Sequence, residues 1–197
     1  MTVSITCFHT CDNRGNKEEI LSKVPFISNS GKIEWLGKGY YFWTDSDYFA
    51  HKWGKIEPRN GNYVITKFQV DIEHVDFLDL VGDVEAQRFF ESLIYKYVNT
   101  LNIKLRNAKG SFNKAKIQEK ISKVAVSTCI QHFRKENKLP FKAIKSQDIN
   151  IENPKGLKYI HGDHKYDFLP LPTRQQIVVY EEGKDCLSPP QWYFISK

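Results

Sequence analysis

The sequence predicts one α+β domain in which strands near both ends of the chain flank a pair of helices. Apolar residues alternate over 3–9, form a continuous run over 177–180, and recur at helical spacing over 83–101. The 197 residues contain no internal repeat and no low-complexity linker, which favours a single domain, 1–197. A chain of this length can bury roughly 70% of the surface that its unfolded form exposes, so it needs neither disulfides nor metal to fold.

The first part of the chain is predicted to contain two strands and a short helix. Val3–His9 has the alternation of a strand with one buried face. Asn16–Val24 (NKEEILSKV) has the composition of a short helix, which Pro25 ends. Leu36–Thr44 (LGKGYYFWT) combines a glycine-containing turn with an aromatic strand.

A second short helix and a long strand are expected next. Asp45 or Ser46 can cap the amino end of a helix over Tyr48–Trp53, and Gly54 is expected to end that helix. Tyr63–Ile72 (YVITKFQVDI) is rich in β-branched and aromatic residues, which predicts a strong strand.

A helical insertion into the β-rich core is predicted at about 83–138. Asp83–Leu101 carries an apolar stripe at helical spacing. A basic loop, Lys104–Phe112, leads to a second helix over about Asn113–Lys135. This second helix is expected to present most of its lysines to solvent and to bury Ile117, Ile121, Val124, Ala125 and Thr128.

Two late segments complete the predicted sheet. Phe141–Lys145 is one strand, and Gln176–Tyr180 (QIVVY) is the other. After Gln176 the second segment is continuously apolar, which favours a central position in the sheet.

The net charge of +6 is unevenly distributed. Between residues 104 and 145, twelve cations face two carboxylates, a net charge of +10, whereas the rest of the chain carries −4. Lys116, Lys120 and Lys123 lie in this basic segment. A basic segment on a weakly acidic body favours a polyanionic partner such as nucleic acid, and a solvated lysine-rich helix without a partner is the alternative.

The sequence favours a cytoplasmic protein with no membrane partner. No apolar run reaches the length of a transmembrane helix, and the start MTVSITCFH lacks the features of a signal peptide. The four cysteines include no C-x-x-C pair, so reduced thiols are expected.

Familiar catalytic and metal-binding signatures are absent from the sequence. It has no P-loop, no G-x-G-x-x-G, no H-E-x-x-H and no G-x-S-x-G. Cys7, His9 and Cys11 share a predicted strand face. His161 and His164 form an H-x-x-H pair. Neither set has the spacing of a known zinc site, so no metal is predicted.

The most informative segment is LGKGYYFW at 36–43, followed by AHKW at 50–53. It resembles the LGKGIYF…A element of the ADP-ribosyltransferase superfamily, which includes diphtheria toxin and the poly-ADP-ribose polymerases. The spacing agrees, because Ala50 follows Tyr41 by nine residues. A bacterial group of uncharacterised domains with the element G-K-G-F-Y-x-T…A-x-x-W is more similar still.

Two further motifs of this superfamily have counterparts in the same order. The first motif is a histidine at the end of the first strand, followed by a small residue, and His9-Thr10 lies in that place. The third begins a late strand, and RQQIVVY at 174–180 is similar to the family's N-E-Y-I-V-Y. Alignment through Tyr180 places Gln176 where the family has its catalytic glutamate. The bacterial group also tends to have glutamine there.

The resemblance implies a split β-sheet core and NAD as the substrate that supplies ADP-ribose. It gives His9 a hydrogen bond to a ribose hydroxyl, the backbone of Thr10 a contact with the nicotinamide carboxamide, and Tyr41 a face on which nicotinamide stacks. Glycines in the turn let the backbone approach the dinucleotide, and a lysine there is expected to approach its pyrophosphate. The predicted NAD-binding residues are His9, Thr10, Lys38, Gly39, Tyr41 and Tyr48, and the predicted catalytic residues are His9, Tyr41 and Gln176.

Glutamine at position 176 restricts the expected chemistry. A glutamate would hold the ribose, stabilise positive charge and deprotonate a weak nucleophile. Glutamine keeps the hydrogen bonds but is no base near neutral pH, so we predict a single transfer rather than chain extension. Glu34, Glu181 and Glu182 are carboxylates near these motifs in the sequence, which does not choose a base among them.

The predicted function is mono-ADP-ribosyl transfer from NAD to a nucleic acid, and RNA is the favoured acceptor. The basic insertion would bind phosphates, and the many aromatic residues would stack on unpaired bases. Small cytosolic bacterial members of the superfamily are often toxins of toxin–antitoxin or phage-defence systems, so an antitoxin protein is a further expected partner. Two alternatives stay open: a protein side chain as the acceptor, or a catalytically inactive relative that binds nucleic acid.

Overall fold

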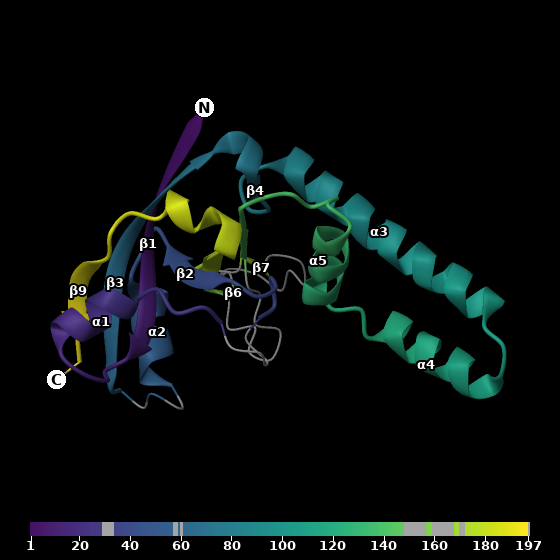
Figure 1. Cartoon of the computed structure of the whole chain (residues 1–197), viewed down its shortest axis with the longest axis horizontal. Coiled ribbons are helices and arrows are strands. Elements are labelled where there is room, and N and C mark those ends of the chain that lie inside the picture. The colour runs from purple at the N-terminus through teal and green to yellow at the C-terminus, as the bar shows by residue number, and fades with distance from the viewer. Residues whose placement is uncertain are drawn as a thin grey trace.

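A central β-sheet with helices around it forms the described part of the chain (Figure 1). The computed structural model describes residues 1–28, 34–56, 59, 61–147, 157–158, 168–169 and 172–196. The strands of the central sheet are β1 (Thr2–Asp12), β2 (Tyr40–Thr44), β3 (Tyr63–Glu73), β4 (Phe77–Asp79), β5 (Ala143–Gln147), β8 (Gln175–Val179) and β9 (Gln191–Ile195). The helices are α1 (Lys17–Lys23), α2 (Tyr48–Lys55), α3 (Val84–Asn107), α4 (Ser111–Ser122), α5 (Val126–Lys135) and the short 3-10 helices η1 (His74–Asp76) and η2 (Glu181–Cys186).

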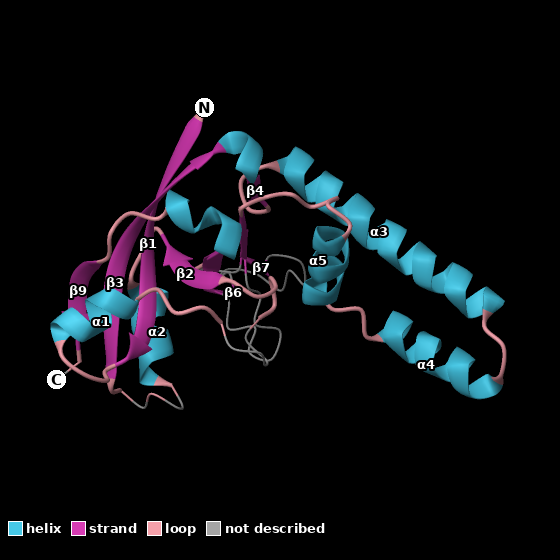
Figure 2. Ribbon diagram, in the orientation of Figure 1, coloured by secondary structure: helices cyan, strands magenta, loops and turns pink. Residues whose placement is uncertain are grey.

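The strand order of the sheet is β4-β5-β8-β2-β1-β3-β9. Figure 2 shows its strands β9, β3, β1 and β2 in this order. The β4–β5 pair is parallel and the other neighbours are antiparallel. A separate two-stranded sheet contains β6 (Leu157–Lys158) and β7 (Phe168–Leu169). The predicted α+β class is therefore confirmed, and β8 has strand neighbours on both sides, as the apolar run over 177–180 predicts.

The strongest pairing of the sheet joins β1 to β3. Their register runs from Thr2 opposite Glu73 to Asp12 opposite Tyr63 without interruption. Both strands extend beyond the segments that alternation predicts, because hydrogen bonds to a neighbour continue where the apolar pattern stops. The short β4 and the edge strand β9 were not predicted, since β4 has only three residues and β9 carries no fully buried side chain.

The sheet divides between β1 and β2. These strands pair only at Cys7 opposite Thr44 and Phe8 opposite Trp43. Beyond Phe8, β1 continues along β3, whereas β2 runs along β8. The edge of β1 that faces β2 therefore has no strand partner after Phe8 among the described residues, and a fork opens between the two strands.

Three apolar clusters pack against this sheet. One contains Cys7, Phe42 and Phe68 together with residues of α1 and β8. The second packs α3 and α5 on the side of β5 and β8, and the third packs α2 on β1 and β3. Each buried large apolar side chain contributes about 1.5–3 kcal/mol, so these clusters stabilise the strands on both sides of the fork.

The helix after β2 differs from its prediction at both ends. Asp47 rather than Asp45 or Ser46 is the N-cap residue, and its side chain makes no capping hydrogen bond. Ser46 Oγ accepts a hydrogen bond from the Tyr48 N–H at 3.2 Å. Gly54 does not end the helix, which continues to Lys55. Gly54 is buried instead, because the Tyr63 ring packs directly on it.

The second predicted helix of the insertion consists of two helices. The chain leaves helical geometry at Lys123, between α4 and α5. Residues 104–107, expected in a loop, belong to α3. The break changes which side chains face inward: Ala125 and Thr128 are exposed, and Ile117, Ile121 and Val124 are only half-buried. The residues that α5 buries are Cys129, Ile130 and Phe133. The single-domain organisation with an insertion at 83–138 stays a prediction.

The contact between Gly54 and Tyr63 predicts an unusual response to alanine. A Cβ at Gly54 would lie 2.3 Å from Tyr63 Cδ2, so we expect Gly54→Ala to lower the free energy of unfolding by about 1–3 kcal/mol. Helix propensity alone predicts the opposite sign, a gain of about 1 kcal/mol. Urea unfolding measures the difference. The control is Gly54→Ala in a Tyr63→Leu background, where the substitution should lower the free energy of unfolding by a smaller amount. A Gly54→Ala protein that is more stable than the wild type would contradict the close contact between Gly54 and Tyr63.

Candidate functional site

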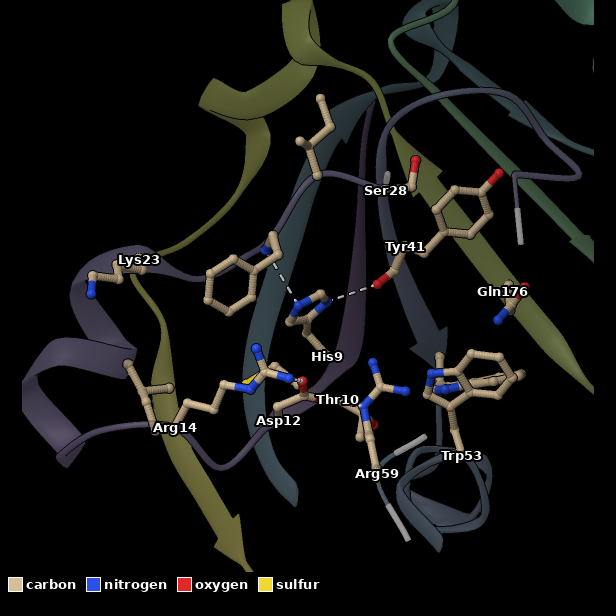
Figure 3. Close-up of a pocket in the computed structure, with 15 residues that line it drawn as sticks. His9, Thr10, Asp12, Arg14, Lys23, Ser28, Tyr41, Trp53, Arg59 and Gln176 are labelled. Atoms are coloured by element: carbon tan, nitrogen blue, oxygen red, sulfur yellow. Dashed lines mark hydrogen bonds and ion pairs between the residues drawn. The ribbon is translucent and has the colours of Figure 1, made fainter. Parts of the chain in front are cut away.

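A histidine occupies the fork between β1 and β2. The Phe26 N–H donates to His9 Nε2 at 3.3 Å, so the neutral ring carries its proton on Nδ1, which donates to the Tyr41 carbonyl at 3.0 Å (Figure 3). The side chain thus makes the hydrogen bond to β2 that a neighbouring strand would make. Burial lowers the pKa of His9 from 6.5 to about 4, and the nearby cation Arg59 acts in the same direction. His9 is therefore neutral at pH 7.

A cavity of about 570 Å³ opens beside this histidine. It lies in the fork, which we call the fork cleft. His9 and Thr10 from β1, Tyr41 from β2 and Gln176 from β8 all line it (Figure 3). The three motifs singled out in the sequence therefore meet at one cavity, whose volume is typical of small-molecule sites.

The Tyr41 ring lines the cleft with its hydroxyl group already bonded. The hydroxyl donates to the Gly37 carbonyl at 2.7 Å and accepts from the Leu36 N–H at 2.9 Å. Gly37 has a φ of +89°, which glycine adopts without strain. Burial raises the pKa of Tyr41, so the phenol stays protonated. The glycine turn therefore holds the ring in place at the wall of the cleft.

Gln176 is oriented by a tryptophan. The Trp35 indole N–H donates to Gln176 Oε1 at 2.8 Å. Because indole can only donate, this contact fixes the amide oxygen toward Trp35 and leaves the amide nitrogen to face other partners. At the cleft, the Gln176 amide nitrogen can therefore donate a hydrogen bond to a ligand.

Among the described residues, three cationic side chains and one carboxylate line the fork cleft: Arg14, Lys23, Arg59 and Asp12. Asp12 lies 2.9 Å from Arg14 Nη2 and 3.2 Å from Arg59 Nε. The Arg59 guanidinium also lies over the Trp53 ring, 5.6 Å from its centroid. The balance of charge in the lining favours an anionic ligand. Sequence reasoning missed both arginines, because they lie in irregular segments after β1 and α2, where no periodic pattern identifies a binding residue.

The other predicted NAD-binding residues lie outside this cleft. Lys38 is exposed and is not part of the lining. Gly39 packs against β8, where a Cβ would lie 2.6 Å from Val178 Cγ2, so this glycine is required by the sheet. Tyr48 lines a second depression, of about 670 Å³, together with Phe49. The structure therefore brings His9, Thr10, Tyr41 and Gln176 together but not Lys38, Gly39 or Tyr48.

The three carboxylates considered as bases have different surroundings. Glu181 accepts a hydrogen bond from the Tyr40 hydroxyl at 3.3 Å, and Glu182 pairs with Arg134. Glu34 accepts a hydrogen bond from Ser28 Oγ at 3.0 Å, and Ser28 lines the fork cleft. Of the three, Glu34 is the one tied to a residue of the cleft.

The cysteines near the site are packing residues. Cys7 and Cys11 are buried, and burial raises the pKa of the Cys7 thiol and brings that of Cys11 to about 11. All four cysteines are free. Among the described residues, no group of three or more His, Cys, Asp or Glu is placed to hold a metal ion. His161 and His164 lie outside the described residues.

Comparison with protein-family models, with curated proteins and with solved structures finds no match for this chain. The helices in the described ranges include none with the length and hydrophobicity needed to span a bilayer.

The lowered pKa of His9 predicts how stability depends on pH. The unfolded chain binds a proton at His9 below pH 6.5, whereas the folded protein binds it only near pH 4, so acid favours unfolding in this window. We expect the free energy of unfolding to fall by about 1 kcal/mol per pH unit from pH 6.5 to 4, relative to a His9→Gln variant that does not titrate there. Denaturant unfolding of both proteins at several pH values measures this, and parallel curves would show that His9 is not held neutral.

Proposed function

We propose that the chain is an NAD-dependent mono-ADP-ribosyltransferase and that its forked sheet is the split sheet of that superfamily. One observation carries the proposal. His9, Tyr41 and Gln176 are far apart in the sequence but come from three adjacent strands and line one cavity. These positions were chosen from the resemblance alone, and a chance resemblance gives no reason for them to share a cleft.

The chemistry of the lining fits a pyridine dinucleotide. The anchored Tyr41 ring offers a stacking face for nicotinamide. The edge of β1 after Phe8 has no strand partner among the described residues, and its backbone suits a carboxamide. Arg14 and Arg59 suit the pyrophosphate, and they replace Lys38 in this role. Trp53, beneath the Arg59 guanidinium, suits the adenine ring.

In the proposed transfer, one bond to ribose C1′ breaks and another forms. The bond between the nicotinamide nitrogen and ribose C1′ breaks, and nicotinamide leaves with the electron pair. A nucleophilic atom of the acceptor bonds to C1′ and loses its proton. Within this reaction, a ribose hydroxyl donates a hydrogen bond to His9 Nε2 and takes the place of the Phe26 N–H, whose hydrogen bond is long at 3.3 Å. The Gln176 amide nitrogen donates to a second ribose oxygen. We propose Glu34, through Ser28, as the group that receives the proton.

The proposed setting is that of a cytoplasmic bacterial toxin of a toxin–antitoxin or phage-defence system, with an antitoxin protein as its partner. The alternative is a catalytically inactive relative that binds nucleic acid and does not transfer ADP-ribose. Two observations favour it: both ring nitrogens of His9 already have backbone partners, and Gln176 presents a donor where a catalytic carboxylate would present an acceptor. Turnover separates the two functions.

Labelled NAD tests the chemistry and the role of Tyr41. We expect wild-type protein to release nicotinamide and to label an acceptor when total RNA or cell lysate is present. Tyr41→Ala should lose roughly 10- to 100-fold in rate, because stacking on the ring is lost. Tyr41→Phe keeps the ring but loses the two hydroxyl hydrogen bonds that hold it, so its rate should lie between those of the wild type and Tyr41→Ala. Binding of NAD without any nicotinamide release by the wild type would favour the inactive relative.

The two cationic positions give a matched test of where the pyrophosphate lies. Arg59→Ala and Lys38→Ala each remove one positive charge, but only Arg59 lines the fork cleft. We expect Arg59→Ala to weaken NAD binding roughly tenfold, the loss typical of a charged hydrogen bond, and Lys38→Ala to leave it unchanged. Isothermal titration with NAD measures both. A larger effect from Lys38→Ala would move the pyrophosphate to the glycine turn.

A further inference from the structure

The second half of α3 and all of α4 form a hairpin that extends away from the sheet (Figure 1). No residue from 98 to 125 belongs to any of the three core clusters. Helix α4 has no buried residue. Apart from Tyr97, which packs against the second cluster, and Leu101, which is buried, this hairpin adds little to the core of the protein, and most of its surface is available to a partner. We call residues 96–123 the basic arm.

The basic arm carries the excess charge of the protein. It has eight cations and one carboxylate, a net charge of +7, so the remainder of the chain carries −1. All eight cations are exposed. Within the described residues, Lys123 is the one cation of the arm that forms an ion pair, with Glu119. Unpaired, exposed cations close together raise one another's electrostatic energy, and a polyanion relieves this repulsion.

Three of these lysines form a stripe with an aromatic side chain at the tip. Phe112, Lys116 and Lys120 follow one another at intervals of four residues, which places them on one face of α4, and Lys123 lies at the end of the helix, three residues after Lys120. That face lies away from the half-buried Ile117 and Ile121. Phe112 is 79% exposed, an unusual position for phenylalanine. An exposed ring beside a row of lysines combines the two elements that bind single strands, stacking and phosphate contact.

These features favour a nucleic acid over a protein partner. Protein interfaces are depleted in lysine and bury apolar groups at their centre, whereas the outer face of α4 offers mostly lysine. Phosphate contacts come from exposed Lys and Arg side chains. A single strand is favoured over a duplex, because only unpaired bases can stack on Phe112, and RNA commonly presents such bases in loops and ends.

We propose that the basic arm binds single-stranded RNA through Lys116, Lys120, Lys123 and Phe112 and brings it to the fork cleft as the acceptor. The role as acceptor rests on the proposed transferase function, whereas the binding does not. RNA binding and NAD turnover are therefore measured separately, so that the failure of one leaves a clear result for the other.

The experiment is fluorescence anisotropy of a short unstructured RNA with the full chain, without NAD, over a range of salt concentrations. A triple variant, Lys116→Glu, Lys120→Glu and Lys123→Glu, is compared with a matched control, Lys17→Glu, Lys55→Glu and Lys184→Glu, whose three exposed lysines lie on the body. Both triple variants change the net charge equally. We expect the arm variant to bind at least about tenfold more weakly and its salt slope to fall by about 2, with the control near wild type.

Several outcomes would overturn the proposal. Equal weakening in both triple variants would mean that overall charge, not the arm, governs binding. Unchanged binding by the arm variant would remove the arm from recognition, and tighter binding to DNA of the same sequence would exclude RNA as the ligand. Because α4 buries no side chain, the arm variant should still fold and unfold cooperatively. Phe112→Ala, which leaves every charge in place, should weaken binding without altering the salt slope. NAD hydrolysis without RNA should be unchanged in all variants.

Discussion

The hydrogen bonds of one neutral imidazole hold the fork of the sheet in its observed geometry. Strands β1 and β2 pair at two positions and then separate, which leaves backbone groups on both strands without ladder partners. His9 satisfies the Tyr41 carbonyl with Nδ1 and the Phe26 N–H with Nε2. Because burial keeps the ring neutral, it can donate at one nitrogen and accept at the other, which an imidazolium cannot do. A protonated His9 would leave the Phe26 N–H facing a donor, so the fork and the charge state of His9 depend on each other.

Glycines maintain the walls of this fork by close contact. Gly39 lets the start of β2 approach β8, and Gly54 lets α2 approach β3. The first contact keeps Gln176 beside β2, and the second keeps Trp53 over the cleft. The motif G-K-G therefore has a structural explanation that is independent of any ligand: one glycine forms the turn that anchors Tyr41, and the other permits strand contact.

The sequence predicted those parts of the molecule whose signal is local and periodic. The sequence identified β1 by its alternation, β8 by its apolar run over 177–180 and α3 by its apolar stripe. The order and spacing of the motifs singled out His9, Tyr41 and Gln176, and the structure places all three at one cleft. The break between α4 and α5 was missed, because the apolar residues on either side of Lys123 also fit one helix. Arg14 and Arg59 were missed for another reason: their position depends on a shared ion-pair partner, Asp12, and no one-dimensional pattern records that.

The protein has two cationic regions, and their physical differences suit different ligands. In the fork cleft, Arg14 and Arg59 are held by Asp12, and Arg59 is also packed on Trp53. The packed, largely covered Arg59 guanidinium loses little entropy on binding and favours one small anion in one orientation. On the basic arm, the lysines are exposed and almost all unpaired, so they adapt to phosphates in many arrangements. A rigid site for a defined dinucleotide beside an adaptable surface for a polymer is the arrangement that transfer from one to the other requires.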